Sequence, residues 1–133
     1  MAEKKTYSIR NLASEFDITI RSIRFYEDQG LLSPIRRGQT RIYNSNDRVR
    51  LILILRGKRL GFSLAEIDEL LSLWDRTPSG SEKQLKLLLE KITLRKAELE
   101  QQMEDIVALQ IELSQAERSS RKALRKLKAK RNN

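Results

Sequence analysis

The sequence predicts a mainly α-helical protein with a compact N-terminal head and one long C-terminal helix. Two short segments near the N-terminus carry apolar residues at helical spacing and are separated by a tight break, which is typical of two packed short helices. After residue 80 the chain contains no Gly and no Pro, and apolar residues recur there every seven positions. Such a repeat predicts a helix that pairs along an apolar seam.

The head opens with two predicted helices, over residues 9–16 and 20–29. Ser8 and Thr19 are placed to cap them, and Gly30 is placed to end the second. The inward side chains are expected to be Ile9, Leu12, Ala13 and Phe16 in the first helix, and Ile20, Ile23 and Phe25 in the second. Two short helices joined by a tight turn form a helix-turn-helix unit, whose second helix commonly enters the major groove of DNA.

Residues 35–43 (IRRGQTRIY) predict a short hairpin, or wing, after the second helix. Gly38 lies at its middle, where the conformational freedom of glycine suits a tight turn. We expect Ile35 and Ile42 to face inward and the arginines of the hairpin to face outward.

Two further helices are predicted, each by a capping signal. Asn44 and Asp47 have the spacing of a capping box before a helix that reaches about residue 60. The run LILIL (51–55) fits a strand equally well, but the length of the segment, its cap and its flanking arginines favour a helix. Ser63 begins an S-x-x-E capping box, and the helix that follows has an apolar stripe of Leu64, Ile67, Leu70, Leu71 and Trp74.

A hinge is predicted at residues 76–80, followed by a coiled-coil dimerisation helix over 81–118 and a basic tail over 119–133. The apolar residues at seven-residue spacing, called here the heptad ladder, are Leu85, Ile92, Leu99, Ile106 and Leu113. Because the chain supplies no second long helix to cover this ladder, we expect a homodimer. The tail is interpreted either as a solvated, partly disordered end or as an additional, non-specific attraction for DNA.

Charge is segregated along the chain, which has a net charge of +9. Residues 1–62 carry 13 basic and 6 acidic side chains, and residues 63–117 carry 6 basic and 12 acidic ones. Residues 118–133 carry 8 basic and no acidic side chains. A basic head fits a surface that binds phosphates, whereas an acidic middle segment does not.

The sequence contains no Cys and no His. This excludes a disulfide scaffold, a thiolate or imidazole metal site, and a Ser–His or Cys–His catalytic pair. We therefore expect no catalytic residues, no metal ligands, no cofactor and no enzymatic activity. No run of 18 apolar residues and no secretory signal are present, so we expect a cytoplasmic, nucleoid-associated protein that makes no membrane contact.

Four sequence blocks resemble the MerR family of bacterial transcription regulators: YSIRNLASEFDIT (7–19), IRFYEDQGLLSP (23–34), GQTRIYNSNDRVRL (38–51) and LGFSLAEI (60–67). The resemblance implies a winged helix-turn-helix DNA-binding domain over residues 6–75 and an antiparallel pairing of the long helix. It also implies a homodimer that distorts double-stranded promoter DNA in response to a small-molecule effector, so that RNA polymerase can use the promoter.

Two segments carry a narrower resemblance, RRGQTRIY (36–43) and LILRGKRLGFSL (53–64). They are similar to regulators of leucine, isovalerate and other branched-chain amino-acid catabolism. This similarity implies control of acyl-CoA breakdown, with a degradation intermediate as the effector.

Arg21 and Arg24 are the leading candidates for base contacts. They lie three residues apart on the second helix and therefore on one face. A guanidinium group can bind the O6 and N7 atoms of guanine with two hydrogen bonds. The resemblance implies basic residues against DNA at both positions, and the alternative is a solvated or phosphate-bound face.

The wing and its surroundings supply further candidates through the resemblance. It implies that Tyr26 contacts a phosphate and that Arg41 reaches the DNA backbone or the minor groove. Arg36 and Arg37 either bind DNA or are merely solvated. Tyr43 either touches a phosphate or packs under the wing.

Three more residues complete the predicted DNA-binding set. Ser8 and Thr19 are helix caps first, but helix N-termini also offer backbone N–H groups to phosphates. Lys58 either meets flanking phosphates or keeps an apolar helix soluble.

The alternative function for the whole chain is a nucleoid-type protein that binds nucleic acid by charge without recognising its sequence.

Overall fold

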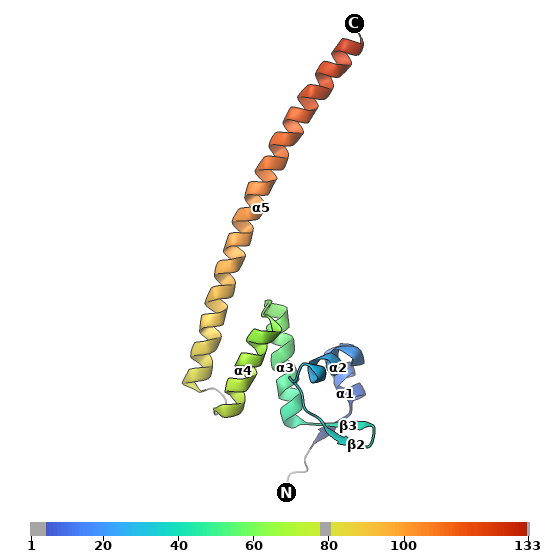
Figure 1. The fold of residues 1–133 in the computed structure, drawn as a ribbon, viewed down its shortest axis with the longest axis vertical. Coiled ribbons are helices and arrows are strands. Elements are labelled where there is room, and N and C mark those ends of the chain that lie inside the picture. The colour runs from blue at the N-terminus through green and yellow to red at the C-terminus, as the bar shows by residue number, and fades with distance from the viewer. Residues whose placement is uncertain (1–4, 78–80, 133) are drawn as a thin grey trace. The chain divides into compact units, whose positions relative to one another are not determined.

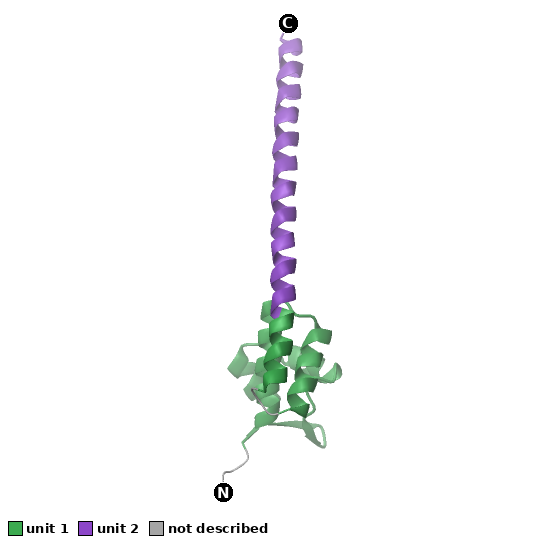
Figure 2. Cartoon of the chain, turned by 90° about the vertical axis from the view of Figure 1, so that its left-hand side faces the viewer, with its two compact units in different colours: residues 1–91 green, residues 92–133 purple. Residues whose placement is uncertain are grey.

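The computed structural model describes residues 5–77 and 81–132. It is mostly helical, with a small sheet near the N-terminus (Figure 1). The chain divides into two compact units, residues 1–91 and residues 92–133 (Figure 2). The elements in order are β1 (Thr6–Tyr7), α1 (Ile9–Phe16), α2 (Ile20–Asp28), β2 (Ile35–Arg37), β3 (Thr40–Asn44), α3 (Ser45–Leu60), α4 (Leu64–Arg76) and α5 (Glu82–Arg131).

The predicted helix-turn-helix is confirmed, together with both of its caps. The Ser8 hydroxyl accepts a hydrogen bond from the Asn11 N–H at 3.0 Å, and the Asn11 side chain accepts one from the Ser8 N–H at 3.0 Å. Asp17 takes a left-handed conformation (φ 53°) and ends α1. Thr19 then caps α2 by accepting a hydrogen bond from the Ser22 N–H at 3.0 Å. The short turn therefore joins two helices, each with one N–H group of its first turn satisfied by the side chain of its cap.

The wing is a hairpin within a three-stranded antiparallel sheet of order β1-β3-β2. β2 and β3 form the predicted hairpin, and Gly38 at its tip has a φ of 64°. β1 pairs with the other edge of β3 and sets Tyr7 opposite Tyr43. This second pairing was not predicted, because a two-residue strand leaves no periodic signal in the sequence.

The ambiguous LILIL segment is helical, as predicted. Asn44 and Asp47 form a reciprocal capping box with distances of 2.8 and 2.9 Å, and α3 then runs for 16 residues. Leu51 and Ile54 are fully buried at helical spacing. The S-x-x-E box at Ser63 is also formed, and α4 packs against α3.

Two predictions of inward-facing residues are wrong. Phe25 is 43% exposed, and Tyr26, at 5% exposure, occupies the core in its place. Ile23 and Tyr26 are three residues apart and share a face, whereas Phe25 lies two residues from Ile23 and points away from it. Ile35 is 63% exposed because β2 is an edge strand, while the helices α1 and α3 pack against β3.

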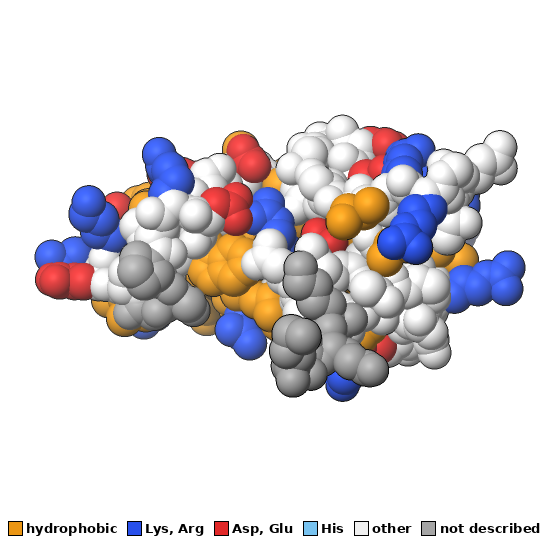
Figure 3. All heavy atoms as spheres, turned by 90° about the horizontal axis from the view of Figure 1, so that it is seen from below, with side chains coloured by type: hydrophobic (Ala, Val, Ile, Leu, Met, Phe, Trp, Pro, Cys, Tyr) orange, Lys and Arg blue, Asp and Glu red, His pale blue; other side chains and the backbone are white. Residues whose placement is uncertain are grey.

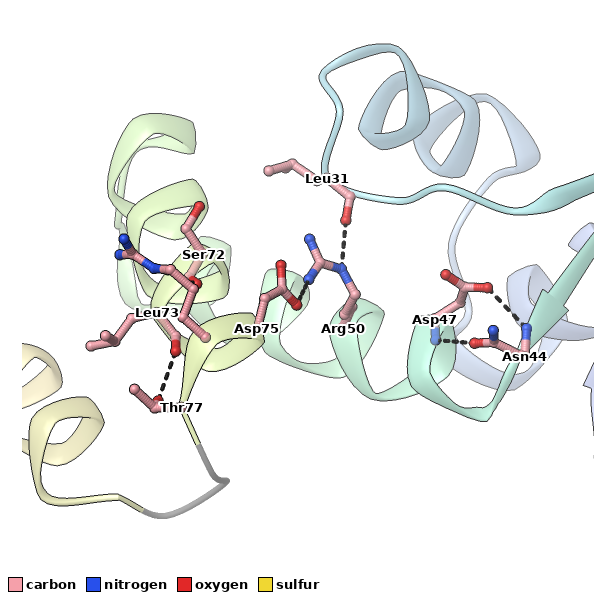
Figure 4. Close-up of polar contacts among 9 residues, drawn as sticks. Leu31, Asn44, Asp47, Arg50, Ser72, Leu73, Asp75 and Thr77 are labelled. Atoms are coloured by element: carbon pink, nitrogen blue, oxygen red, sulfur yellow. Dashed lines mark hydrogen bonds and ion pairs between the residues drawn. The ribbon is translucent and has the colours of Figure 1, made fainter.

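Arg50 of α3 joins three parts of the head (Figure 4). Its Nε donates to the carbonyl oxygen of Leu31 at 3.0 Å, and its Nη1 donates to the carboxylate of Asp75 at 2.5 Å. Leu31 follows α2, and Asp75 lies in the last turn of α4. A single guanidinium group therefore ties the end of the helix-turn-helix and the end of α4 to α3.

The long helix α5 is continuous over its 50 residues. Of the heptad ladder, Ile92 is half-buried and Leu85, Leu99, Ile106 and Leu113 are exposed; their role in a dimer remains a prediction. The helix continues through the tail to Arg131, so the interpretation of 119–133 as partly disordered is wrong. α4 ends at Arg76 with Thr77 as its cap, and the rest of the predicted hinge, Pro78 to Gly80, lies outside the described residues.

The first turns of α5 belong to the same compact unit as the head. Lys91 is buried there, and its Nζ lies 2.7 Å from the Glu69 carboxylate of α4. Within the described ranges, no helix has both the length and the apolarity that crossing a bilayer requires.

Gly57 of α3 lies close against Ile67 of α4. A Cβ at Gly57 would lie 2.8 Å from Cγ1 of the buried Ile67. Gly→Ala within a helix ordinarily stabilises by about 1 kcal/mol. We expect Gly57→Ala instead to lower the free energy of urea unfolding by about 1–2 kcal/mol, because the added methyl group overpacks the contact.

The matched test repeats the same change in the Ile67→Ala background. There the crowding side chain is absent, so Gly57→Ala should raise the free energy of unfolding by up to about 1 kcal/mol. Stabilisation of equal size in both backgrounds would show that the helices are not in close contact at Gly57.

Candidate nucleic-acid interface

The outer face of α2 presents two arginines. Ile23 and Tyr26 hold the opposite face in the core, and this orientation leaves Arg21 and Arg24 exposed. Among the described residues, neither guanidinium group has a hydrogen-bond or ion-pair partner. Two unneutralised cations on one helix face can donate hydrogen bonds to base edges or to phosphates.

Phe25, which was expected in the core, is exposed next to these cations, one residue after Arg24 and four after Arg21. The surface of α2 therefore combines charge with an apolar ring. Counting helical turns from Ile23 would have found it, since Tyr26 satisfies the i, i+3 spacing and Phe25 does not. Figure 3 shows this molecule from below, with Lys and Arg side chains spread over the view together with Asp and Glu side chains and exposed hydrophobic atoms.

A single carboxylate joins α2 to both strands of the wing. Glu27, in the last turn of α2, accepts hydrogen bonds from Nη2 of Arg36 in β2 and from Nε of Arg41 in β3, the latter at 2.6 Å. No local pattern in the sequence points to Glu27. Two of the three wing arginines are thereby oriented by α2, while Arg37 is exposed at the end of β2.

The Glu27 carboxylate stays ionised in this position. Its side chain is 11% exposed, and burial alone would raise the pKa of Glu27. The hydrogen bonds from Arg36 and Arg41 outweigh burial and hold the pKa of Glu27 below its ordinary value of 4.5. The wing is therefore fastened to α2 by a charged cluster over the physiological pH range.

Tyr43 packs under the wing, which was one of the two alternatives predicted for it. The side chain is fully buried, and its hydroxyl has no hydrogen-bond partner among the described residues. Burial, followed by the nearby charge of Glu27, raises the pKa of Tyr43 to about 12. The hydroxyl is buried in this structure, and a phosphate contact by Tyr43 remains a prediction.

The two remaining side chains of the predicted set lie next to each other. Tyr26 is nearly buried, and burial raises the pKa of Tyr26. Lys58 of α3 is exposed, and its Nζ lies 5.9 Å from the centre of the Tyr26 ring, within cation–π range. Phosphate contacts by Tyr26 and Lys58 remain predictions.

The hydroxyls of Ser8 and Thr19 are engaged as caps, as predicted. Thr19 Oγ1 also lies 2.9 Å from the hydroxyl of Ser22. Phosphate binding at these two helix N-termini would use the N–H groups that the caps leave unpaired.

The head also contains an apolar cavity of about 370 Å³, formed by α3, α4 and the first turns of α5. Trp74 is half-buried in its wall, and Arg56 and Gln84 are its polar lining residues. Other residues of the wall are Val49, Leu53, Leu60, Leu85 and Leu88. Within the part of the chain that the structure describes, no group of three acidic, His or Cys side chains is arranged to hold a metal ion.

Two protein-family models match the chain. The model described as "MerR HTH family regulatory protein" covers residues 7–74, and the model described as "MerR, DNA binding" covers residues 48–116. The first spans the helix-turn-helix, the wing, α3 and nearly all of α4. The second extends from α3 into the middle of α5.

Individual proteins show the same similarity. The chain is 31% identical over 108 residues to "HTH-type transcriptional regulator CueR" of Escherichia coli O6:H1, a match that covers 80% of this chain and 77% of the relative. The crystal structure of the transcription regulator PbrR691 from Ralstonia metallidurans CH34, in complex with lead(II), has a TM-score of 0.67 and 31% identity, covering 84% of this chain and 86% of that one.

A third protein of this kind is HiNmlR, described as a MerR family regulator lacking the sensor domain and bound to promoter DNA. Its structure gives a TM-score of 0.56 with 26% identity, covering 75% of this chain and 80% of that chain. The names of these three proteins describe regulators of transcription, and none of the three is named as an enzyme.

The Glu27 cluster makes a pH-dependent contribution to stability that can be measured. The pKa of Glu27 is lower in the folded protein than in the unfolded chain. The cluster therefore contributes its full stabilisation of the folded protein when the pH is above the unfolded-state pKa, near 4.5. This stabilisation disappears as pH falls through the folded-state pKa. We expect Glu27→Gln to lower the free energy of unfolding at pH 7 by about 1–3 kcal/mol, and the difference from wild type to shrink as pH falls below 4.5.

The neighbouring exposed carboxylate provides the control. Asp28→Asn removes the same charge from the same turn of α2 but breaks no described ion pair, so it should change stability by less than about 0.5 kcal/mol. Denaturant unfolding between pH 3 and pH 8 measures both variants. A Glu27→Gln difference that does not depend on pH would refute the ionised cluster.

Proposed function

Because the chain belongs to the MerR family of DNA-binding transcriptional regulators, we propose that it binds a specific promoter sequence as a homodimer. The observation that carries this proposal is the pair of exposed, unneutralised arginines on α2, Arg21 and Arg24, held in place by the buried side of the same helix. The second helix of a helix-turn-helix commonly lies in the major groove. There each arginine would bind a guanine edge or a neighbouring phosphate.

We assign the wing a supporting role in the same complex. Arg37 would contact phosphate directly, while Arg36 and Arg41 would exchange part of their hydrogen bonding to Glu27 for DNA oxygens. Phosphate contacts set register and orientation, whereas base contacts set specificity. In this proposal Ser8 and Thr19 place helix N-termini near the DNA backbone, and Tyr26 and Lys58 lie at the margin of the contact.

The homodimer is proposed to form through the heptad ladder of α5. Four of its five residues are exposed in a single chain, which leaves the ladder available for a second copy. Charge favours an antiparallel pair. In a parallel pair the two segments 118–133, each with eight basic and no acidic residues, would lie side by side and repel one another.

Control by a small molecule is also part of the proposal. The effector would change how the dimer distorts promoter DNA, and RNA polymerase would respond to the altered promoter. The relative PbrR691 is described in complex with lead(II), but this chain has no Cys and no His to bind a soft metal ion. The apolar cavity that contains Trp74 is better suited to an organic effector.

Control of one metabolic pathway is a more specific hypothesis than promoter binding itself. Similarity of residues 36–43 and 53–64 to regulators of branched-chain amino-acid catabolism supports an acyl-CoA-type effector, and the relatives reported above carry other names. The chain would work on the chromosome, associated with the nucleoid, and without enzymatic activity. The alternative is a nucleoid-type protein that binds nucleic acid without sequence preference; the two differ in whether promoter and random duplex bind equally.

The role of Arg24 is tested by Arg24→Ala. We expect weaker promoter binding and a base preference reduced by about 1–3 kcal/mol at one position of the half-site, because one bidentate contact is lost. The measurement is a set of affinities for the promoter and for its single-base variants at fixed salt. Lys83→Ala, which removes one exposed positive charge from the start of α5, is the control and should leave the base preference intact.

An unchanged base preference in Arg24→Ala would show that Arg24 touches only phosphate or solvent. Equal affinity of the wild-type protein for promoter and random duplex would reject sequence-specific recognition altogether.

The dimer is tested by Leu99→Glu. We expect monomers with little promoter affinity, because a charge within the apolar ladder remains unpaired in the dimer. Leu94→Glu is the matched control: the same substitution two positions after Ile92, outside the ladder, should leave the dimer intact. Sedimentation equilibrium measures both proteins, and a stable Leu99→Glu dimer would contradict the ladder as the interface.

A further inference from the structure

The last turns of α5 carry a surface that neither family model covers. Both models end before residue 118, and the helix continues to Arg131. Residues 118–131 contain eight basic and no acidic side chains, and every one of these residues is exposed. At 1.5 Å per residue this is about one positive charge per 2.6 Å of helix, compared with one negative charge per about 1.7 Å of duplex DNA.

Helical geometry gathers most of these charges on one side. At about 100° per residue, six of the eight fall within an arc of about 160°. This basic face consists of Arg118, Arg121, Lys122, Arg125, Lys126 and Lys128. Within the described chain, only Arg121 among them has an ion-pair partner, Glu117 at 3.2 Å, and both of those side chains are largely exposed.

The opposite side of the same segment continues the heptad ladder. Leu127 lies 14 residues, or two heptads, after Leu113, and Leu124 lies 21 residues after Met103. Pairing of α5 with a second copy would therefore cover the apolar side and leave the basic face in solvent. The charges lie where a large polyanion can reach them even in the dimer.

We infer that the basic face of α5 is a second DNA-binding surface, which holds the phosphate backbone of double-stranded DNA without recognising its sequence. Charge complementarity identifies the partner, and the helix-turn-helix head of the same chain keeps duplex DNA nearby at high effective concentration. A membrane surface suits the segment less well, because Leu124 and Leu127 are its only large apolar side chains and it has no aromatic residue.

Salt dependence provides the test, performed on the full-length protein with a random-sequence duplex. The first variant replaces four residues of the basic face, Lys122→Gln, Arg125→Gln, Lys126→Gln and Lys128→Gln, and leaves both leucines in place. Each phosphate contact contributes about 0.9 to the slope of log affinity against log salt concentration. We expect the slope to become shallower by about 2–4, and the affinity at low salt to fall at least tenfold.

Two matched variants separate location from net charge. Arg76→Gln, Lys83→Gln, Lys86→Gln and Lys96→Gln remove the same number of charges elsewhere in the chain and should leave the slope nearly unchanged. A variant that exchanges cations within the basic face, Lys122→Arg, Arg125→Lys, Lys126→Arg and Lys128→Arg, should retain the wild-type slope. Sedimentation and circular dichroism establish that each variant remains a helical dimer.

Three results would overturn the inference. The first is an unchanged slope in the basic-face variant, and the second is an equal loss of slope in the variant altered elsewhere. The third is tighter binding to phosphatidylglycerol vesicles than to duplex at the same ionic strength, lost when the basic face is neutralised, which would make the segment a membrane contact.

The inference depends on the proposed function only in that a dimer covers the apolar side of α5. The experiment distinguishes the second surface from the proposed function. Arg24→Ala should lose base preference. Its salt-dependence slope on random duplex should keep the part that the basic face contributes. A wild-type protein that fails to distinguish promoter from random duplex, yet loses slope when the basic face is neutralised, would reject the proposed function and support the second surface.

Discussion

The geometry of the nucleic-acid interface depends on one carboxylate. Glu27 closes α2 and at the same time binds an arginine from each strand of the wing. The other attachments of the hairpin to the head are the pairing of β1 with β3, the packing of α1 and α3 against β3, and the buried side chain of Tyr43. Because the carboxylate is mostly shielded and has two cationic partners, its desolvation is compensated and the cluster stays charged. The relative position of helix and wing is therefore set before any DNA arrives.

Other contacts within the head hold α2 and the wing in this arrangement. Ile23 and Tyr26 anchor α2 on its inner side, and Tyr43 fills the space under β3. Arg50 ties the residue after α2 to α3 and to the end of α4. Among the described residues, Arg21 and Arg24 on the outer face of α2 have no ion-pair partner, whereas the inner side of the same helix is held in the core.

The long helix α5 carries different kinds of side chains around its axis and along its length. Around its axis, the apolar ladder lies on one side, and in the last turns a basic face lies on the other. Along its length, acidic residues predominate before residue 118 and only basic ones follow. In the proposed dimer, the apolar ladder would bind the second copy and the charge distribution would disfavour parallel alignment, so partner choice and orientation would have separate physical causes.

Local patterns in the sequence determined the helices, their caps and the ladder, because the spacing of apolar residues and the hydrogen bonds of Ser8, Asn44 and Ser63 act within a few residues of each other. The same patterns identified Arg21 and Arg24, since neighbours on a helix face follow from spacing alone. The spacing from Ile23 also places Tyr26 rather than Phe25 in the core. Only the tertiary structure decided that Glu27 meets arginines 9 and 14 residues away. Those contacts depend on how the wing folds back onto α2, and a packing relation between distant segments leaves no periodic trace in the chain.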